Sequence, residues 1–472
     1  MRAGSRGTRS LLAVLLAACA ACQGGGDALP LPTAAPGGPQ VIVVASGRDV
    51  TGSNGVRQQL ITAWNARHPD LEARLVELPG SADEQRSQLL GALQSGSARY
   101  DVVNLDVTSL PEFADADLIR PLDDRLIDGD VIKSVAATAR WDGKLYAVPF
   151  NTDVGLLFYR RDYLAAAGLR DGDVEGVRDW QRMDNLIDDL NEAKGHGLPV
   201  DYDKGWTSQL ADAEGRTVNA VEAFASLPDP VPLTDDDGRY TASVRDLERG
   251  IGELRGRTLG PYLLGDAWKS HEAESLTAFA DGRTAFLRHW PYAYGTLHQS
   301  LSSGQLGVTR LPGKAVLGGQ NLAVTRSSAN EAGAVALIRY LTSAASERCL
   351  LDAGFAATRT SAYQDDDVTC RSATSAETTS PTPAGSPGSS GSSPGETADR
   401  TPRDASGRPA YARSTLLPAL VHAVSRPRTP LYGAFTQTFS AEIGRLQENE
   451  PPSDEELAER LDRALRHVLP DG

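Results

Sequence analysis

The sequence predicts an α/β protein built as two lobes, with open sheets flanked by helices and three crossings of the chain between the lobes. Short apolar stretches typical of strands alternate with longer stretches typical of helices, which is the order of an α/β fold. Residues 141–159 combine a turn, a strand, a proline break and a second strand, as expected where a chain passes from one rigid lobe to another. The 472 residues are enough for two domains of ordinary size.

The first lobe is predicted over residues 41–149 together with 310–366. Its opening part reads as a strand at 41–45, a helix at 55–65, a strand at 71–78, a helix at 83–94 and a strand at 100–105. A helical stretch at 110–116 and a turn at 121–124 follow. Most of the first lobe is therefore assembled before the chain reaches Pro149.

The first crossing is predicted at Pro149. Because proline withholds a backbone donor and fixes its own φ, the strand at 145–148 should stop there, and a buried strand at 154–159 should follow. Asn151 and Asp153 lie just past the break, where a crossing between lobes would expose their side chains to a cleft. The alternative is an ordinary pair of strands with polar side chains on its surface.

The second lobe is predicted over residues 153–308 together with 410–472. Helical stretches at 180–193, 216–226, 243–255 and 273–281 precede a strand that leads to Trp290. The chain should return to the first lobe at 307–313, where a strand ends in Pro-Gly. A third crossing is expected near 363–370.

The N-terminus has the features of an exported lipoprotein. Three arginines precede an apolar run, Leu11–Ala18, that is too short to span a bilayer, so residues 1–18 read as a signal peptide. The run ends in Leu-Ala-Ala-Cys, the lipobox order, which predicts lipidation of Cys19. Cys22 is a competing acceptor, although the lipobox position three residues before it holds a cysteine. Residues 19–40, rich in Gly, Ala and Pro, read as a flexible stalk.

The remaining cysteines, Cys349 and Cys370, form a candidate disulfide because the protein would occupy an oxidising compartment; two free thiols are the alternative. Residues 372–409 are dominated by Ser, Thr, Pro and Gly. A segment of this composition cannot bury enough apolar surface to fold, so it predicts a disordered surface insertion.

Composition and motifs exclude several classes of function. The chain carries 62 Asp and Glu against 47 Lys and Arg, a net charge of −15, which disfavours nucleic acid as a partner. The seven histidines lack metal-ligand spacing, and no metal or cofactor is expected. A Gly-x-Ser-x-Gly string at 391–395 lies in the low-complexity insertion without the strand and helix that a nucleophile elbow requires.

Five segments of the chain resemble one known family. They are PLDD at 121–124, WDGKLYAVPFNTDVGLLFY at 141–159, FADGRTAFLRHWPYAYGTL at 279–297, LGGQNLAVTRSSANEAGAVALIRYL at 317–341 and RPRTPLYGAF at 426–435. These segments resemble the family 1 extracellular solute-binding proteins, the maltose- and trehalose-type receptors of ABC importers. The resemblance implies a two-lobed, periplasmic-binding-protein-like fold of type II.

The resemblance also implies a set of ligand contacts, carried over position by position. They are Asp49, Arg86, Asp106, Asn151, Asp153, Glu214, Trp290, Gln320 and Arg426. Other roles remain open for three of them: Asp49 could cap a helix, Arg86 could lie on a helix surface, and Arg426 could pack the lobes together. Ala213 replaces a family tyrosine and Thr108 a family tryptophan, which puts the usual disaccharide in doubt.

The expected function is that of a lipid-anchored, monomeric receptor on the outer face of the cytoplasmic membrane. It would bind a sugar, a disaccharide or an oligosaccharide, by closing its lobes, and would deliver the sugar to an ABC permease. It is not expected to be an enzyme. One alternative is an extracytoplasmic sensor with the same fold. Another is a glycan hydrolase that uses two carboxylates from among Asp106, Asp153 and Glu214.

Overall fold

The structure is a computed structural model that describes residues 40–48, 55–79, 81–97, 99–195, 197–258, 260–374 and 399–472. The predicted signal peptide, the lipidation site Cys19 and the candidate contact Asp49 lie outside the described residues. Most of the predicted insertion, residues 375–398, also lies outside them.

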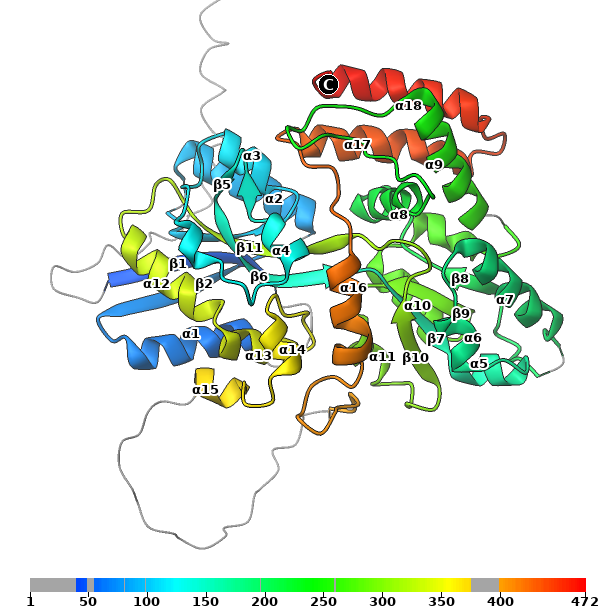
Figure 1. The fold of residues 1–472 in the computed structure, drawn as a ribbon, viewed down its shortest axis with the longest axis horizontal. Helices are drawn as coiled ribbons and strands as arrows, with labels where there is room; N and C mark the ends of the chain where they lie inside the picture. The colour runs from blue at the N-terminus through cyan, green and yellow to red at the C-terminus, as the bar shows by residue number, and fades with distance from the viewer. Residues whose placement is uncertain are drawn as a thin grey trace, which may run out of the picture.

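One half of the molecule is built on a five-stranded sheet in the order β2-β1-β3-β11-β6 (Figure 1). Its strands are β1 (Gln40–Gly47), β2 (Leu71–Leu78), β3 (Val102–Asp106), β6 (Ala147–Val154) and β11 (Leu317–Val324). Strand β1 pairs in parallel with β2 and β3, whereas β11 pairs antiparallel with β3 and β6. Because β3 is covered on both sides, three of its five side chains are apolar and buried: Val102, Val103 and Leu105.

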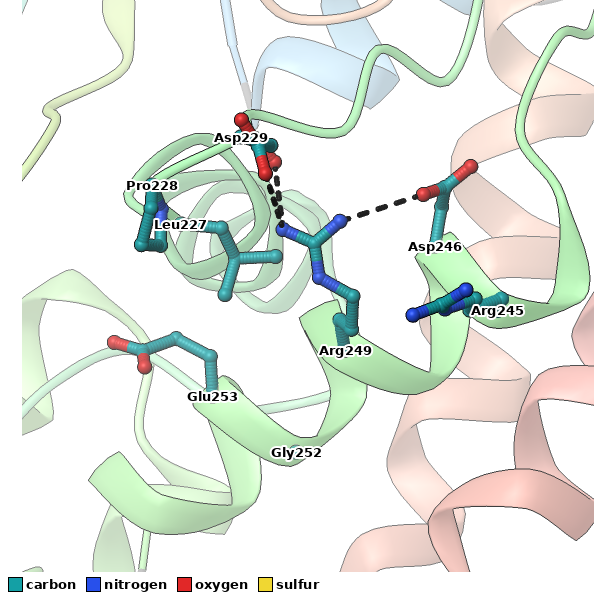
Figure 2. A pocket seen from close by; sticks show the side chains of 8 residues that line it. All are labelled: Leu227, Pro228, Asp229, Arg245, Asp246, Arg249, Gly252 and Glu253. Carbon is teal, nitrogen blue, oxygen red and sulfur yellow. Dashed lines mark hydrogen bonds and ion pairs between the residues drawn. The ribbon is translucent and has the colours of Figure 1, made fainter.

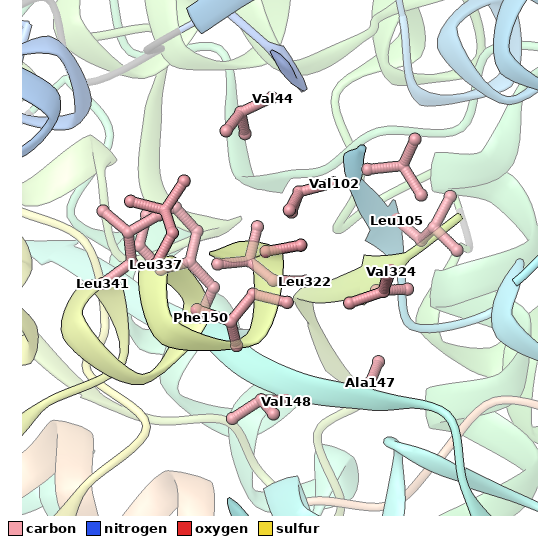
Figure 3. Close-up of a cluster of buried hydrophobic side chains, with 14 of the residues drawn as sticks. Val44, Val102, Leu105, Ala147, Val148, Phe150, Leu322, Val324, Leu337 and Leu341 are labelled. Carbon is pink, nitrogen blue, oxygen red and sulfur yellow. The ribbon is translucent and has the colours of Figure 1, made fainter. Parts of the chain in front are cut away.

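Helices cover this first sheet. They are α1 (Val56–Arg67), α2 (Ala82–Ser95), α3 (Leu110–Asp115), α4 (Lys133–Ala137), α12 (Glu331–Leu341), α13 (Ala344–Asp352), α14 (Thr360–Gln364) and α15 (Cys370–Thr374). Helix α2 begins with a capping box, in which Ser81 accepts from the N–H of Glu84, and ends at Gly96 with φ 65°. Figure 3 shows strand side chains such as Val102 and Leu322 gathering with Leu337 of α12 in one hydrophobic core.

The other half is built on a four-stranded sheet in the order β10-β7-β9-β8. Its strands are β7 (Leu156–Arg160), β8 (Lys204–Thr207), β9 (Thr284–His289) and β10 (Leu306–Arg310), and the short strands β4 (Arg140–Trp141) and β5 (Lys144–Leu145) form a separate ladder. The helices of this half are α5 (Arg161–Ala166), α6 (Asp171–Glu175), α7 (Trp180–Glu192), α8 (Glu214–Ala225), α9 (Val244–Arg257), α10 (Glu272–Ala280), α11 (Ala293–Leu297), α17 (Tyr432–Ile443) and α18 (Asp454–Val468). Helix α16 (Leu417–His422) lies between the two halves (Figure 1).

The chain passes between the sheets at closely packed positions. Strand β6 belongs to the first sheet and β7 to the second, with Gly155 between them. The return runs from β10 to β11, and Val316 on this return accepts a backbone hydrogen bond from Gly155 at 3.4 Å. The segment that follows α16 lies beside this return, because Val424 forms a parallel bridge with Val316.

Strand β6 does not end at Pro149, as the sequence suggests, but continues to Val154. The pairing of β6 with β11 shifts register between Gln320 and Asn321, and Asn321 is the residue opposite Pro149. A register shift frees one strand from regular pairing, so it accommodates a residue that has no N–H to donate.

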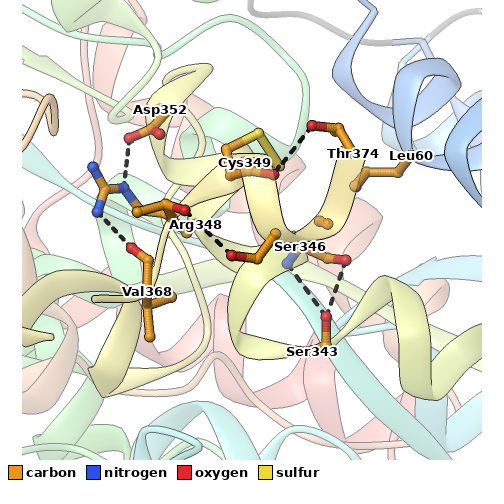
Figure 4. The surroundings of a disulfide bond; sticks show 12 residues. Leu60, Ser343, Ser346, Arg348, Cys349, Asp352, Val368 and Thr374 are labelled. Atoms are coloured by element: carbon orange, nitrogen blue, oxygen red, sulfur yellow. Dashed lines mark hydrogen bonds and ion pairs between the residues drawn. A yellow bond between two sulfur atoms is a disulfide. The ribbon is translucent and has the colours of Figure 1, made fainter. Parts of the chain in front are cut away.

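A disulfide joins Cys349 of α13 to Cys370 at the start of α15 (Figure 4). Near it, Arg348 binds Asp352 at 2.7 Å and the carbonyl of Val368 at 2.9 Å. Residues 399–409, the far end of the predicted insertion, are packed rather than loose. Arg408 is fully buried there and donates to the carbonyl of Ala362 at 2.8 Å. Among the described helices, none has the length and apolarity to cross a membrane.

Candidate functional site

A cavity of about 420 Å³ lies between the two sheets and takes its lining from both. Seven of the nine predicted ligand contacts line it: Asp106, Asn151, Asp153, Glu214, Trp290, Gln320 and Arg426. The described lining also contains residues that were not predicted, among them Arg57, Asp83, Gln209, Glu272, Tyr292 and Phe355.

Three polar residues reach the cavity from neighbouring strands of the first sheet. Gln320 on β11 lies opposite Asp106 at the end of β3 and opposite Asn151 on β6. Cross-strand partners have Cβ atoms about 5 Å apart, so sheet pairing alone brings these side chains together. The register of the strands therefore places Asp106, Asn151 and Gln320 side by side at this edge of the sheet.

Arg57 organises two of these residues, and the sequence analysis did not identify it. This buried arginine of α1 donates to Asn151 Oδ1 at 3.2 Å, to Gln320 Oε1 at 3.1 Å and to the carbonyl of Gly47 at 2.8 Å. Its guanidinium also lies 4.9 Å from the ring centroid of Phe355. The amide oxygens of Asn151 and Gln320 are thus occupied by Arg57. Their amide N–H groups remain to donate hydrogen bonds to a ligand.

Arg426 bridges the two halves through carboxylates. Its guanidinium binds Asp106 at the end of β3 at 3.2 Å and Glu214 at the start of α8 at 2.7 Å. Glu214 also accepts from Thr436 at 2.7 Å and from the hydroxyl of Tyr432. Burial raises the pKa of Glu214 despite these partners. Although burial disfavours its charge, the neighbouring Asp106, Tyr432 and Glu214 raise the pKa of Arg426 overall.

Asp153 is a cavity-lining acid whose pKa is strongly raised. Burial, and then the charge of Asp106, raise its pKa from 3.8 to about 7, while Arg57 and Arg426 act in the opposite direction. At neutral pH its carboxyl group is therefore divided between two states. As an acid it donates a hydrogen bond, and as a carboxylate it accepts several.

Trp290 forms an aromatic wall immediately after β9. The guanidinium of Arg288 lies 4.0 Å from its ring centroid. Gly318 on β11 faces the ring, because a Cβ added there would lie 3.4 Å from Trp290 and 3.2 Å from the Cβ of Asp153. A glycine at this position lets the ring approach the strand closely.

Two predicted contacts are not among the described lining of the cavity. Arg86 of α2 forms a 2.6 Å ion pair with Glu112, and its guanidinium packs against Gly433 at the start of α17. It therefore connects elements of the two halves beside the cavity. The second residue, Asp49, lies outside the described residues.

A separate hollow of about 700 Å³ lies over α9, lined by residues such as Leu227, Arg249 and Glu253 (Figure 2). Arg249 is held there by Asp229 at 3.8 Å and Asp246 at 3.6 Å. Its charge is balanced by these carboxylates. No described group of three His, Cys, Asp or Glu side chains has an arrangement that could hold a metal ion.

Sequence comparison relates the chain to proteins that bind solutes. The family model described as bacterial extracellular solute-binding protein matches residues 59–376. A "Probable ABC transporter-binding protein" of Deinococcus radiodurans is 31% identical over 235 residues, which cover 48% of this chain and 54% of the relative. The chain thus matches about half the length of that relative.

Structural comparison finds the same architecture. Maltose-bound MalE3 of T. maritima aligns with a TM-score of 0.70 at 21% identity, over 91% of this chain and 100% of that chain. UgpB of Mycobacterium tuberculosis, in complex with glycerophosphocholine, aligns with a TM-score of 0.68 at 18% identity, over 92% of this chain and 98% of that chain. Because these two proteins hold different ligands, the likeness identifies the fold and leaves the ligand open.

These matches confirm the two-lobed α/β fold and the family that the sequence motifs predict. The chain belongs to the bacterial extracellular solute-binding proteins, a family of binding proteins that act outside the cytoplasm.

Proposed function

We propose that this chain is a lipid-anchored receptor that captures a disaccharide or an oligosaccharide outside the cytoplasm and delivers it to an ABC permease. The observation that carries the proposal is the polar cavity between the two sheets, with Trp290 as one wall. Its volume of about 420 Å³ lies within the range of small-molecule sites. In this scheme the two halves close around the sugar.

The lining suits a ligand with many hydroxyl groups. Asp106 and Asp153 offer acceptors, Asn151 and Gln320 offer amide donors, and the indole face of Trp290 can cover the apolar side of a sugar ring. Each hydrogen bond contributes about 1 kcal/mol net, and micromolar affinity corresponds to about −8 kcal/mol. Several such bonds together with stacking supply that affinity after the cost of closure.

Two comparisons support the transport role. The Deinococcus relative carries the name of an ABC transporter-binding protein, and the T. maritima structure holds maltose. The lipobox at Cys19 adds the membrane anchor to the proposal.

Binding without turnover is part of the proposal. A glycoside hydrolase needs two carboxyl groups free to act as acid and as nucleophile or base. Arg426 binds both Asp106 and Glu214, and this ion pairing lowers the nucleophilicity of the two carboxylates. Chromatography of oligosaccharides incubated with the protein should show no products, and the appearance of shorter sugars would favour a hydrolase.

A thermal-shift screen over monosaccharides, disaccharides and polyols, followed by calorimetry on the best compound, tests the proposal directly. We expect one or more disaccharides to raise Tm in a concentration-dependent way, because a ligand that binds only the folded state stabilises it. A response to polyols or phosphodiesters alone, with none to any sugar, would contradict it.

A further inference from the structure

A fully buried ion pair lies behind the cavity. Arg288 of β9 binds Glu222 of α8 through two hydrogen bonds of 2.7 and 3.1 Å, and the two side chains are 1% and 3% exposed. Neither residue belongs to the described lining of the cavity. A buried ion pair recovers its desolvation cost only with good geometry, so its presence at this place needs a reason.

The ion pair contacts both of the first two crossings. Glu222 Oε1 accepts from the N–H of Val316 at 3.0 Å, on the return between β10 and β11. At Gly155, between β6 and β7, an added Cβ would lie 2.9 Å from Arg288 Nη2 and would also collide with Glu222. The backbone of each crossing is therefore in direct contact with the ion pair.

The same pair supports the aromatic wall. The Arg288 guanidinium lies 4.0 Å from the centroid of Trp290, close enough for a cation–π contact. Arg288 is in turn held by Glu222 and lies 3.5 Å from Gln209 Oε1. The ring position is thus linked to Gly155 and Val316 through two side chains.

We propose that Glu222 and Arg288 are positioning residues that set Trp290 against the two crossings, so that a change in crossing geometry moves the aromatic wall. The effect on ligand binding rests on the proposed function, whereas the effect on the ring does not. A ring fixed in this way sits ready for a ligand without an ordering cost on binding.

The first test is Gly155→Ala in the full chain, read by acrylamide quenching of tryptophan fluorescence. The signal of Trp290 is isolated by repeating each measurement with Trp290→Phe. We expect the quenching constant of Trp290 to change by about twofold or more, because the new methyl group displaces the guanidinium that covers the ring. Gly129→Ala is the matched control, since a Cβ there meets no atom within 4 Å.

A second variant avoids an unpaired buried charge: Glu222→Leu combined with Arg288→Met. Its matched control is Glu253→Leu combined with Arg257→Met, which removes a 2.8 Å pair whose arginine lies 4.7 Å from the Trp180 centroid, outside the cavity lining. Only the first pair should alter Trp290 quenching. Unchanged quenching of Trp290 in both Gly155→Ala and the Glu222/Arg288 variant would overturn the proposal.

Maltose serves as the binding probe. If wild-type protein binds it, we expect the Glu222/Arg288 variant to bind about tenfold more weakly and the Glu253/Arg257 control to match wild type. Equal affinity in both variants would contradict the positioning role. If wild-type protein binds neither maltose nor any other sugar of the screen, the proposed function fails, while the quenching result still decides whether the pair positions the ring.

Discussion

At the scale of single residues, Trp290 is the side chain whose loss should affect ligand binding most. Its ring lies beside the guanidinium of Arg288 and close to Gly318 of β11, and it borders the cavity. We expect Trp290→Ala to weaken binding of the best sugar from the screen by about 2 kcal/mol, because stacking area is lost while the polar contacts remain. Calorimetry measures this change.

Trp268→Ala is the matched control for that variant. Trp268 is also half-buried and lies in the same half of the molecule, but it is absent from the cavity lining. Its substitution should leave sugar affinity unchanged. A Trp290 variant that folds normally and binds as tightly as wild type would remove the aromatic wall from the site.

Asp153 should make stability depend on pH. Its folded pKa is about 7 against an ordinary value of 3.8, so the unfolded state ionises first as pH rises. The stability associated with the protonated group is complete below about pH 4 and is lost as pH rises toward 7. Asp153→Asn removes this loss, and we expect it to gain up to about 4 kcal/mol relative to wild type across this interval.

Urea unfolding of wild type and Asp153→Asn at several pH values measures the difference. The comparison is needed because other buried acids, such as Glu347 with a pKa of about 8, shift stability in the same direction in both proteins. Asp70→Asn, at an exposed aspartate, is the matched control for the substitution itself. A difference for Asp153→Asn that did not grow between pH 4 and 7 would show that its pKa is ordinary.

At the scale of elements, strand β11 contains a position, Gly319, whose backbone conformation and close neighbours favour glycine. This residue has φ 114°, and an added Cβ would lie 2.5 Å from the Cα of Thr152 and would collide with the carbonyl of Asn151. It lies one residue before Gln320, after which the pairing with β6 shifts register and accommodates Pro149. The glycine therefore serves the irregular pairing of two strands that both contribute to the cavity.

We expect Gly319→Ala to lower the free energy of unfolding by about 2 kcal/mol or more, because the left-handed φ and the backbone contact both oppose a side chain. Thermal and urea unfolding monitored by circular dichroism measure the loss. Gly129→Ala should stay close to wild type, since its Cβ meets open space. Equal stability of the two variants would mean that β11 can shift to accept the methyl group.

At the scale of the whole molecule, the proposed lipid anchor and the cavity belong to separate parts of the chain. The lipobox lies more than twenty residues before β1, the first described strand. We expect Cys19→Ser to move the protein from the membrane fraction to the soluble fraction, because the acyl chains that hold it are no longer attached. Immunoblots of fractionated cells measure the distribution.

Cys22→Ser is the control and should remain in the membrane fraction. Release by Cys22→Ser alone would assign lipidation to that cysteine instead. Sugar binding by the soluble Cys19 variant should equal that of wild type, since the cavity is formed by residues of the two halves.

Much of the molecule follows from local sequence. Alternating apolar patterns predict most strands and helices of both halves, and the proline break predicts Asn151 and Asp153 beside a cleft. These features depend on neighbours within about ten residues, where periodicity and proline or glycine chemistry act. The place of Trp290 beside the cleft was implied by the family resemblance of its segment.

Other features were decided only by tertiary structure. Arg426 meets Asp106 across 320 positions, and Arg57 meets Asn151 across 94, so no local pattern indicates either contact. The same is true of β6, which continues through Pro149 because its partner strand shifts register. The sequence by itself determined the α/β order and the crossing at residues 141–159, because these depend on local preference. The pairing of charges around the cavity was decided by tertiary structure, because it depends on which distant strands and helices pack together.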